Sequence, residues 1–334
     1  MMYAGPNCDK QLLSDLQRAR KHRSSDEHER GNWKRPRSDE YERRHEERTP
    51  FDLMPPDKKC DTFKVAFDYY TPRAHFIILP RDKSKPGTDY NSLKPEARLK
   101  VVNAAMAMVS HYGLQNSAIL SLHFGSWITT KNMFHAHVCS NVKKYLSVYE
   151  SKKGEIPNWP SREYVTKQWK ASKDPRNYAT NVQQYPLRTY FKEEVEAVTE
   201  YRRSKPTSAE ATLSPSSPFT AILYHPSEPR VGFAVEKSAK PKSAESFLEA
   251  QETIVKFASQ NKLTDMNVKG DDNGCHVCLV LDENSHGFVL EDSQVLVGYI
   301  QITGLKFYRD LCPHDKRDDW FKKFSSMEDY KVYT

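Results

Sequence analysis

The sequence predicts an α+β protein in which helices pack on an antiparallel sheet, with this fold present in two tandem copies behind a disordered N-terminal tail. Short apolar runs bounded by turn residues predict the strands, and helix-periodic segments lie between them. The same order of patterns recurs in both halves of the chain. The chain has 334 residues, and one hydrophobic core stops growing at roughly 250 to 300, so we expect two folded units.

Composition limits the class of protein. The charged fraction of 28% and the mean hydropathy of −0.79 are polar for a globular chain, so part of it is expected to be unfolded. The net charge of +7 favours anionic partners such as nucleotides, RNA or DNA. The six cysteines are scattered, and no apolar leader or membrane-length run is present. We therefore expect a reducing, intracellular compartment and no membrane partner.

Residues 1–58 are expected to form a disordered charged tail, because they contain few aliphatic groups to offset the entropy of ordering. The run from Trp33 to Arg37 is a candidate nuclear import signal or an arm that contacts RNA or protein. A solubilising mixed-charge tail is the alternative. The expected location is nuclear or cytoplasmic, with the nucleus favoured.

The first unit is predicted over residues 59–200, including a C-terminal extension that ends in a helix over 190–201. Its helix is expected to be capped at its start by Asn91 or Ser92, and Gly113 provides a left-handed stop. The strands before and after that helix, the first two of them a hairpin, are expected at residues 63–70, 75–80, 117–124 and 134–140.

A linker rich in Ser and Pro is predicted at residues 201–218, and a second unit at 219–330. The second unit is expected to be a degenerate copy of the first, packed against it through a sheet edge or helix face. In this alignment residues 274–279 match residues 135–140, so that His276 takes the place of His137. Coincidence between two ordinary α+β patterns is the alternative.

The candidate chemistry lies on the strand over 134–140. Alternate side chains of a strand share a face, so His135 and His137 point one way while Phe134, Ala136 and Val138 pack under the helix. Two imidazoles beside a polar connection suit a bound phosphate, because one ring can attack phosphorus while other donors stabilise the oxygens. Two structural histidines are the alternative, and so is a metal pair, although no third ligand is evident nearby in the sequence.

Two strings resemble the histidine-triad (HIT) family. Residues 72–81 resemble its early strand, in which a proline-containing turn leads to His, aliphatic residues, Pro and a basic residue. Residues 133–140 resemble its signature of histidines alternating with apolar residues. The resemblance covers residues 63–148. The segment around Trp169 and Tyr190 is more weakly similar to the aprataxin branch, and the C-terminal stretch to a HIT-related splicing-factor family.

This resemblance implies nucleotide binding, with His135 as the nucleophile on the α-phosphate and His137 as a partner that stabilises the phosphate oxygens. The residues expected to contact or shape the nucleotide site are His75, Arg81, Gly125, Ser126, Thr130 and Asn132. The chain departs from the family at the first histidine, which is Met133, and methionine cannot relay a proton.

Two functions follow from the resemblance and from this departure. The first is a nucleotidyl hydrolase or transferase, of phosphoramidase or pyrophosphatase type, that acts on a nucleotide or a nucleic-acid end. The second is a catalytically silent HIT scaffold that binds nucleotide or RNA in a nuclear complex.

Zinc binding by cysteine is a further hypothesis, with Cys275 and Cys278 in a C-x-x-C and Cys312 and His314 as a distal pair. Residues three apart on a strand face opposite sides, however, which favours buried thiols. No metal and no cofactor are expected.

Overall fold

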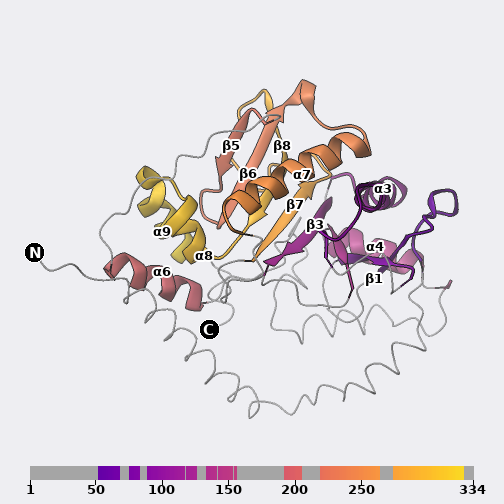
Figure 1. Cartoon of the computed structure of the whole chain (residues 1–334), viewed down its shortest axis with the longest axis horizontal. Coiled ribbons are helices and arrows are strands. Elements are labelled where there is room, and N and C mark those ends of the chain that lie inside the picture. Colours follow the sequence, from indigo (N-terminus) through magenta and orange to yellow (C-terminus); the bar gives the residue numbers. More distant parts are fainter. Residues whose placement is uncertain are drawn as a thin grey trace, which may run out of the picture. The chain divides into compact units, whose positions relative to one another are not determined.

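The computed structural model describes residues 52–67, 75–82, 89–116, 118–125, 133–140, 142–152, 154–155, 192–204, 219–263 and 274–326. Within these ranges the chain is an α+β structure built on one open, antiparallel, eight-stranded sheet (Figure 1). The strands are β1 (Phe63–Phe67), β2 (His75–Pro80), β3 (Ala118–Phe124), β4 (Ala136–Ser140), β5 (Ala221–Tyr224), β6 (Arg230–Glu236), β7 (Cys275–Val280) and β8 (Gln294–Gln301).

The α-helices of the described residues are α3 (Pro95–His111), α4 (Val142–Ser151), α6 (Lys192–Ser204), α7 (Ala244–Gln260), α8 (Gly304–Lys306) and α9 (Arg317–Ser325). Shorter turns are η1 (Pro56–Lys58), η4 (Lys237–Ala239), the π-helical η6 (Phe307–Leu311) and η7 (His314–Lys316). None of these helices is long and apolar enough to cross a membrane.

The sheet repeats one topology twice. Its strand order is β1-β2-β4-β3-β7-β8-β6-β5. In the first half, two strands, α3 and two further strands follow one another along the chain, and in the second half β5, β6, α7, β7 and β8 do the same. Read from the outer edge inward, the two halves are β1-β2-β4-β3 and β5-β6-β8-β7, which is the same order. The halves meet through their sheet edges, as predicted, where β3 pairs with β7.

This topology corrects the predicted alignment of the halves. Residues 274–279 do not match residues 135–140, because β7 takes the place of β3 at the central seam and β8 takes the place of β4. The register then identifies the counterpart of His137. This histidine pairs with the third residue of β2 and the fourth of β3. Tyr299 pairs with the third residue of β6 and the fourth of β7.

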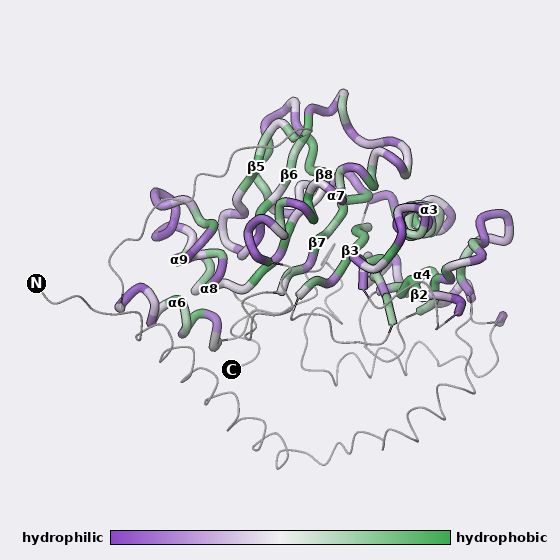
Figure 2. Tube along the Cα trace, in the orientation of Figure 1, coloured by the Kyte–Doolittle hydropathy of each residue, from purple (hydrophilic) through white to green (hydrophobic). Residues whose placement is uncertain are grey.

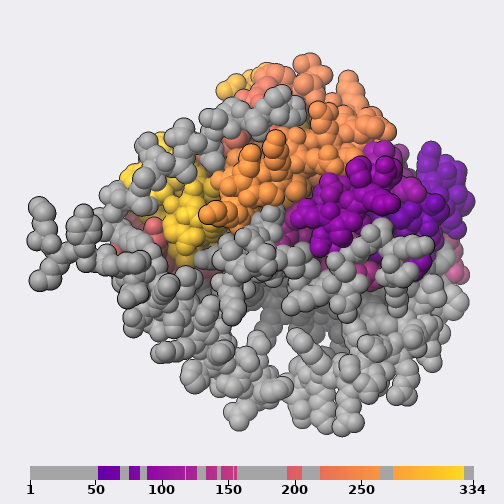
Figure 3. Space-filling model, in the orientation of Figure 1, coloured from indigo at the N-terminus to yellow at the C-terminus, as the bar shows by residue number. Residues whose placement is uncertain are grey.

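Helices α3 and α7 cover the same face of the sheet and contact each other, and the space-filling view shows them side by side (Figure 3). Arg98 of α3 forms an ion pair with Glu252 of α7 at 3.2 Å, and Tyr90 donates to Gln251 at 3.1 Å. The apolar residues beneath the two helices form one continuous core that extends through both halves. Figure 2 shows the hydrophobic colouring along β6, β7 and β8 under α7.

The fold begins earlier than predicted. Residues 52–58 were expected to belong to the disordered tail, yet Leu53 and Met54 are buried in the core, and the Leu53 amide donates to Val65 at 2.7 Å. Burial of these two apolar side chains offsets the entropy of ordering this segment. Residues 1–51 lie outside the described part of the chain.

Two other predicted boundaries are wrong. Helix α3 begins at Pro95 rather than directly after a cap at Asn91 or Ser92, because Ser92 forms a turn with Asp89 and proline favours the first helical position. The predicted linker overlaps α6, which continues to Ser204, while residues 205–218 lie outside the described ranges. Gly113 has a φ of +65° and ends α3 in the left-handed conformation, as predicted.

Candidate functional site

The face of the sheet opposite α3 and α7 carries a group of histidines in mutual ring contact. We call it the histidine face, and it consists of His75, His123, His135, His137 and His276. The residues that alternate with these histidines point into the core under the helices, as Phe134, Ala136 and Val138 do. The predicted division of this strand between core and opposite face is confirmed.

Strand pairing brings the histidines together from four strands. His137 pairs with Ile77 on β2 and with Ser121 on β3, which places it between those two strands. His75 begins β2, and its ring centroid lies 5.5 Å from that of His137. His135 immediately precedes β4, and its centroid is 5.2 Å from that of His137.

The remaining two histidines come from the central seam. His123 on β3 pairs with His276 on β7, and their rings stack with centroids 4.5 Å apart. His123 also stacks on His137 at 4.9 Å and meets His135 edge-on at 5.4 Å. The second half therefore contributes an imidazole to the same cluster.

Exposure differs along the histidine face. His75, His137 and His276 are buried, with 1%, 6% and 4% of their surface exposed, whereas His123 and His135 are half-buried. His123 and His135 are therefore the least buried members of the histidine face.

Electrostatics limits how many of these rings carry a proton. Two imidazolium ions about 5 Å apart repel by about 3 kcal/mol at an effective dielectric constant of about 20, so the cluster cannot hold every ring charged. Burial lowers the pKa of His135, and a hydrogen bond with the Met133 backbone opposes this shift. His135 is consequently neutral at pH 7, and the backbone contact orients its ring.

Sequence reasoning missed His123, and it assigned His276 to the second unit rather than to this cluster. His123 lies on the predicted strand 117–124, and its alternation with the core residues Leu122 and Phe124 was enough to place it on the face of His137. Nothing local indicated that β3 would lie between β4 and β7. The expectation that His135 and His137 have no third potential ligand nearby is wrong, because His123 lies beside both.

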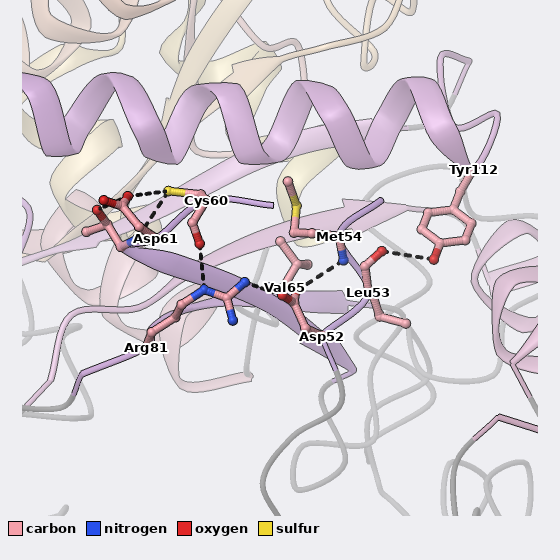
Figure 4. A network of polar contacts seen from close by, with 9 residues as sticks. Asp52, Leu53, Met54, Cys60, Asp61, Val65, Arg81 and Tyr112 are labelled. Atoms are coloured by element: carbon pink, nitrogen blue, oxygen red, sulfur yellow. Dashed lines mark hydrogen bonds and ion pairs between the residues drawn. The ribbon is translucent and has the colours of Figure 1, made fainter. Parts of the chain in front are cut away.

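Arg81 lies away from the histidines, contrary to the expectation that it helps to shape the site. It follows β2 at the end opposite His75, which is roughly 20 Å away along an extended strand of this length. Its guanidinium forms an ion pair with Asp52 and donates to the Cys60 carbonyl at 2.5 Å (Figure 4). Arg81 thus anchors the start of the fold.

The predicted phosphate-contacting connection is described only in part. Gly125 directly follows β3 and has a φ of +61°, a left-handed conformation that glycine adopts without strain. Ser126, Thr130 and Asn132 lie outside the described residues.

The cysteines of the C-x-x-C motif lie on opposite faces of β7. Cys275 belongs to the core under the helices, and Cys278 packs with Tyr299 on the other side. Burial raises the pKa of both thiols, that of Cys278 to about 11, so they are protonated at pH 7. One ion cannot be held by both side chains in this arrangement.

Comparison with protein-family models, with curated proteins and with solved structures finds no match for this chain.

Proposed function

We propose that the chain binds the phosphate of a nucleotide, or of a nucleic-acid end, on the histidine face and transfers or hydrolyses the nucleotidyl group through His135. One observation carries this proposal. His135 is half-buried, in ring contact with His137 and His123, and its imidazole is hydrogen-bonded to the Met133 backbone. A nucleophilic imidazole must be neutral and held in one tautomer, and these contacts meet both requirements.

The reaction proceeds in two displacements. A ring nitrogen of His135 forms a bond to the α-phosphorus, and the bond from phosphorus to the leaving oxygen breaks. Water, or an acceptor hydroxyl, then attacks the phosphorus, and the phosphorus–nitrogen bond breaks to release the nucleotide and restore the imidazole. His137, 5.2 Å away between ring centroids, donates to the phosphate oxygens.

Protonation of the leaving group needs a residue other than Met133. His123 is the best-placed candidate, because its ring meets that of His135 edge-on at 5.4 Å. A protonated His123 transfers its proton to the leaving oxygen and recovers it from the attacking water, so the proton balance closes over one turnover.

The test is a search for a nucleotidyl-protein intermediate. Full-length protein, freed of metal, is incubated with adenylated, guanylated and capped substrates labelled at the α-phosphate. We expect one substrate class to leave an acid-labile, alkali-stable label on His135. In His135→Ala the label should be absent and turnover should fall by at least about 1000-fold, whereas the exposed His111→Ala should match wild type. Turnover that survives His135→Ala would overturn the enzymatic role.

A silent binding module is the second candidate, and Met133 at the first position of the triad favours it. In this case nucleotide or RNA binds on the histidine face without chemistry, within a nuclear complex, and the basic N-terminal tail adds affinity. Equilibrium binding of the same labelled ligands, weakened by His137→Ala but never followed by label transfer, would select this function.

We also propose that the two halves are tandem copies of a HIT-like unit. Their common element order, common strand order and the equivalent registers of His137 and Tyr299 support this. The second copy would then be without nucleotidyl chemistry, since tyrosine occupies the position of His137.

A further inference from the structure

Three imidazoles of the histidine face are arranged as a set of metal ligands. His135 immediately precedes β4, His137 lies on it two residues later, and His123 joins them from β3. One nitrogen from each ring lies within 4.8 Å of the other two. Tetrahedral zinc with nitrogen ligands at about 2.0–2.1 Å from the ion places the nitrogens about 3.3 Å apart. The three nitrogens therefore need to approach one another by at most about 1.5 Å to complete the site.

The chemistry of the donors restricts the ion. An all-imidazole set suits zinc, copper or nickel, whereas magnesium and calcium prefer oxygen ligands. Imidazole must be neutral to coordinate, so binding of the ion should weaken as the pH falls.

The neighbours of these ligands favour a preorganised site. His276 stacks on His123 at 4.5 Å, and His75 meets His137 edge-on at 5.5 Å. Both flanking histidines are buried on paired strands, so they limit larger movements of the two rings that they contact.

We propose that His123, His135 and His137 bind a first-row transition metal ion, zinc in particular. Three protein ligands leave the fourth tetrahedral position open to water or to a phosphate oxygen. The proposal goes beyond nucleotidyl transfer and is an alternative use of the same rings, because a His135 nitrogen that coordinates zinc has no lone pair with which to attack phosphorus. Zinc should therefore bind and block His135 chemistry.

The first experiment uses cobalt as a spectroscopic substitute for zinc. Full-length protein, stripped by a chelator and kept reduced, is titrated with Co²⁺ in the absence of nucleotide. We expect one equivalent to bind with the visible absorption of tetrahedral cobalt and without a thiolate charge-transfer band, and one equivalent of Zn²⁺ to remove the absorption. An absence of saturable cobalt binding would overturn the proposal, and so would a thiolate band, which would assign the ion to the cysteines.

Variants identify the ligands. His123→Ala and His137→Ala should each weaken cobalt binding by more than about 100-fold, since loss of an outer-shell partner alone costs about 10- to 100-fold. His111→Ala, an exposed histidine on α3, should bind as wild type does. Circular dichroism and thermal melts check that each variant is folded, and His123→Gln repeats the test with a side chain closer in size. Unchanged affinity in folded His123→Ala would refute the site.

The two experiments test metal binding and nucleotidyl chemistry at His135 separately. Cobalt binding is measured without nucleotide, and the nucleotidyl intermediate is sought in metal-free protein, so each can fail while the other succeeds. Should both succeed, one equivalent of Zn²⁺ is expected to suppress labelling of His135 by at least 10-fold, the direct consequence of shared nitrogens. Labelling that persists at saturating Zn²⁺ would show that the ion does not use His135.

Discussion

The two halves of the sheet share one strand order but present different faces opposite the helices. In the first half His75 meets His137 with ring centroids 5.5 Å apart. In the second half the equivalent positions hold Arg230, the first residue of β6, and Tyr299, with the guanidinium 5.1 Å from the ring centroid. The pairwise contact is preserved while its chemistry changes from two imidazoles to a cation over an aromatic ring.

The second half also covers this face with its own β7–β8 connection. Phe288 of this connection packs with Tyr299, and a Cβ built on Gly232 would lie 2.8 Å from the Phe288 ring. The buried Asp282 accepts from the amides of Ala118 and Asn284 at 3.0 and 2.8 Å. The same strand topology thus supports a histidine cluster or a packed polar and aromatic layer, and a few residues on one face decide between them.

The largest effect is expected at Gly298, where a main-chain atom is one of the obstructing neighbours. A Cβ at Gly298 would lie 2.6 Å from both the Cys278 carbonyl and the Ile254 side chain. Gly298→Ala should lower the free energy of unfolding by about 3 to 4 kcal/mol, because backbone on one side and α7 on the other cannot both move. Chemical denaturation measures this.

Gly298→Ala also tests whether the two halves of the sheet unfold together. Since the core runs through both, circular dichroism and tryptophan fluorescence should report one shared transition. Gly154→Ala, where an added methyl group meets nothing within 4 Å, is the control. Two separate transitions, with the first half unaffected, would break the picture of a common core.

Removal of the Asp282 carboxylate, which anchors the β7–β8 connection, should have the next largest effect on stability. Asp282→Ala leaves two amides without their acceptor and removes the partner of His286, 3.0 Å away. We expect a loss of about 3 kcal/mol and faster hydrogen exchange at the Ala118 amide. Asp292→Ala changes an exposed residue of the same connection and should be neutral. Equal effects of the two variants would contradict the anchoring role.

The stability of the protein should also depend on pH, because His225 is buried against Phe288 of the β7–β8 connection. Burial, and then the nearby Arg230 charge, lower the pKa of His225 from its ordinary 6.5 to about 3. Between these values the unfolded chain binds a proton that the folded chain does not, so stability present above pH 6.5 is lost as the pH falls toward 3. Each pKa unit corresponds to about 1.4 kcal/mol.

His225→Asn isolates this contribution. The Nδ1 atom of His225 accepts from the Ser227 and Glu228 amides at 3.2 and 2.9 Å, and asparagine can accept in its place. At pH 7 we expect a loss of about 1 to 2 kcal/mol, because the contact with Phe288 is removed. Denaturation at several pH values should show a shallower decline in the variant than in wild type. Parallel curves would mean that His225 is not the titrating group.

The smallest effect is expected at Gly232, where the obstructing group is a side chain. Gly232→Ala should cost about 1 kcal/mol, because the Phe288 ring can shift away from the new methyl group. In a Phe288→Ala background the same substitution should cost almost nothing, and a double-mutant cycle measures the difference. If the effects of Gly232→Ala and Phe288→Ala on the free energy of unfolding were additive, the two positions would not be in contact.

Local patterns in the sequence predicted the parts of the fold that depend on near neighbours. The alternation of residues 134–138 placed the apolar side chains in the core and the histidines opposite them, because strand geometry alternates side chains whatever the strand pairs with. Helix α3 was predicted because apolar spacing is a property of the helix itself.

The composition of the candidate site was decided only by the tertiary structure. The pairing of β3 with both β4 and β7 places His123 beside His137 and His276 beside His123. The contact of His123 with His276 joins residues more than 150 positions apart, for which no local period exists. The sequence likewise placed Arg81 near the site on the strength of adjacency along one strand. In the folded chain an extended strand instead separates it from His75, and the charge of Asp52 holds it elsewhere.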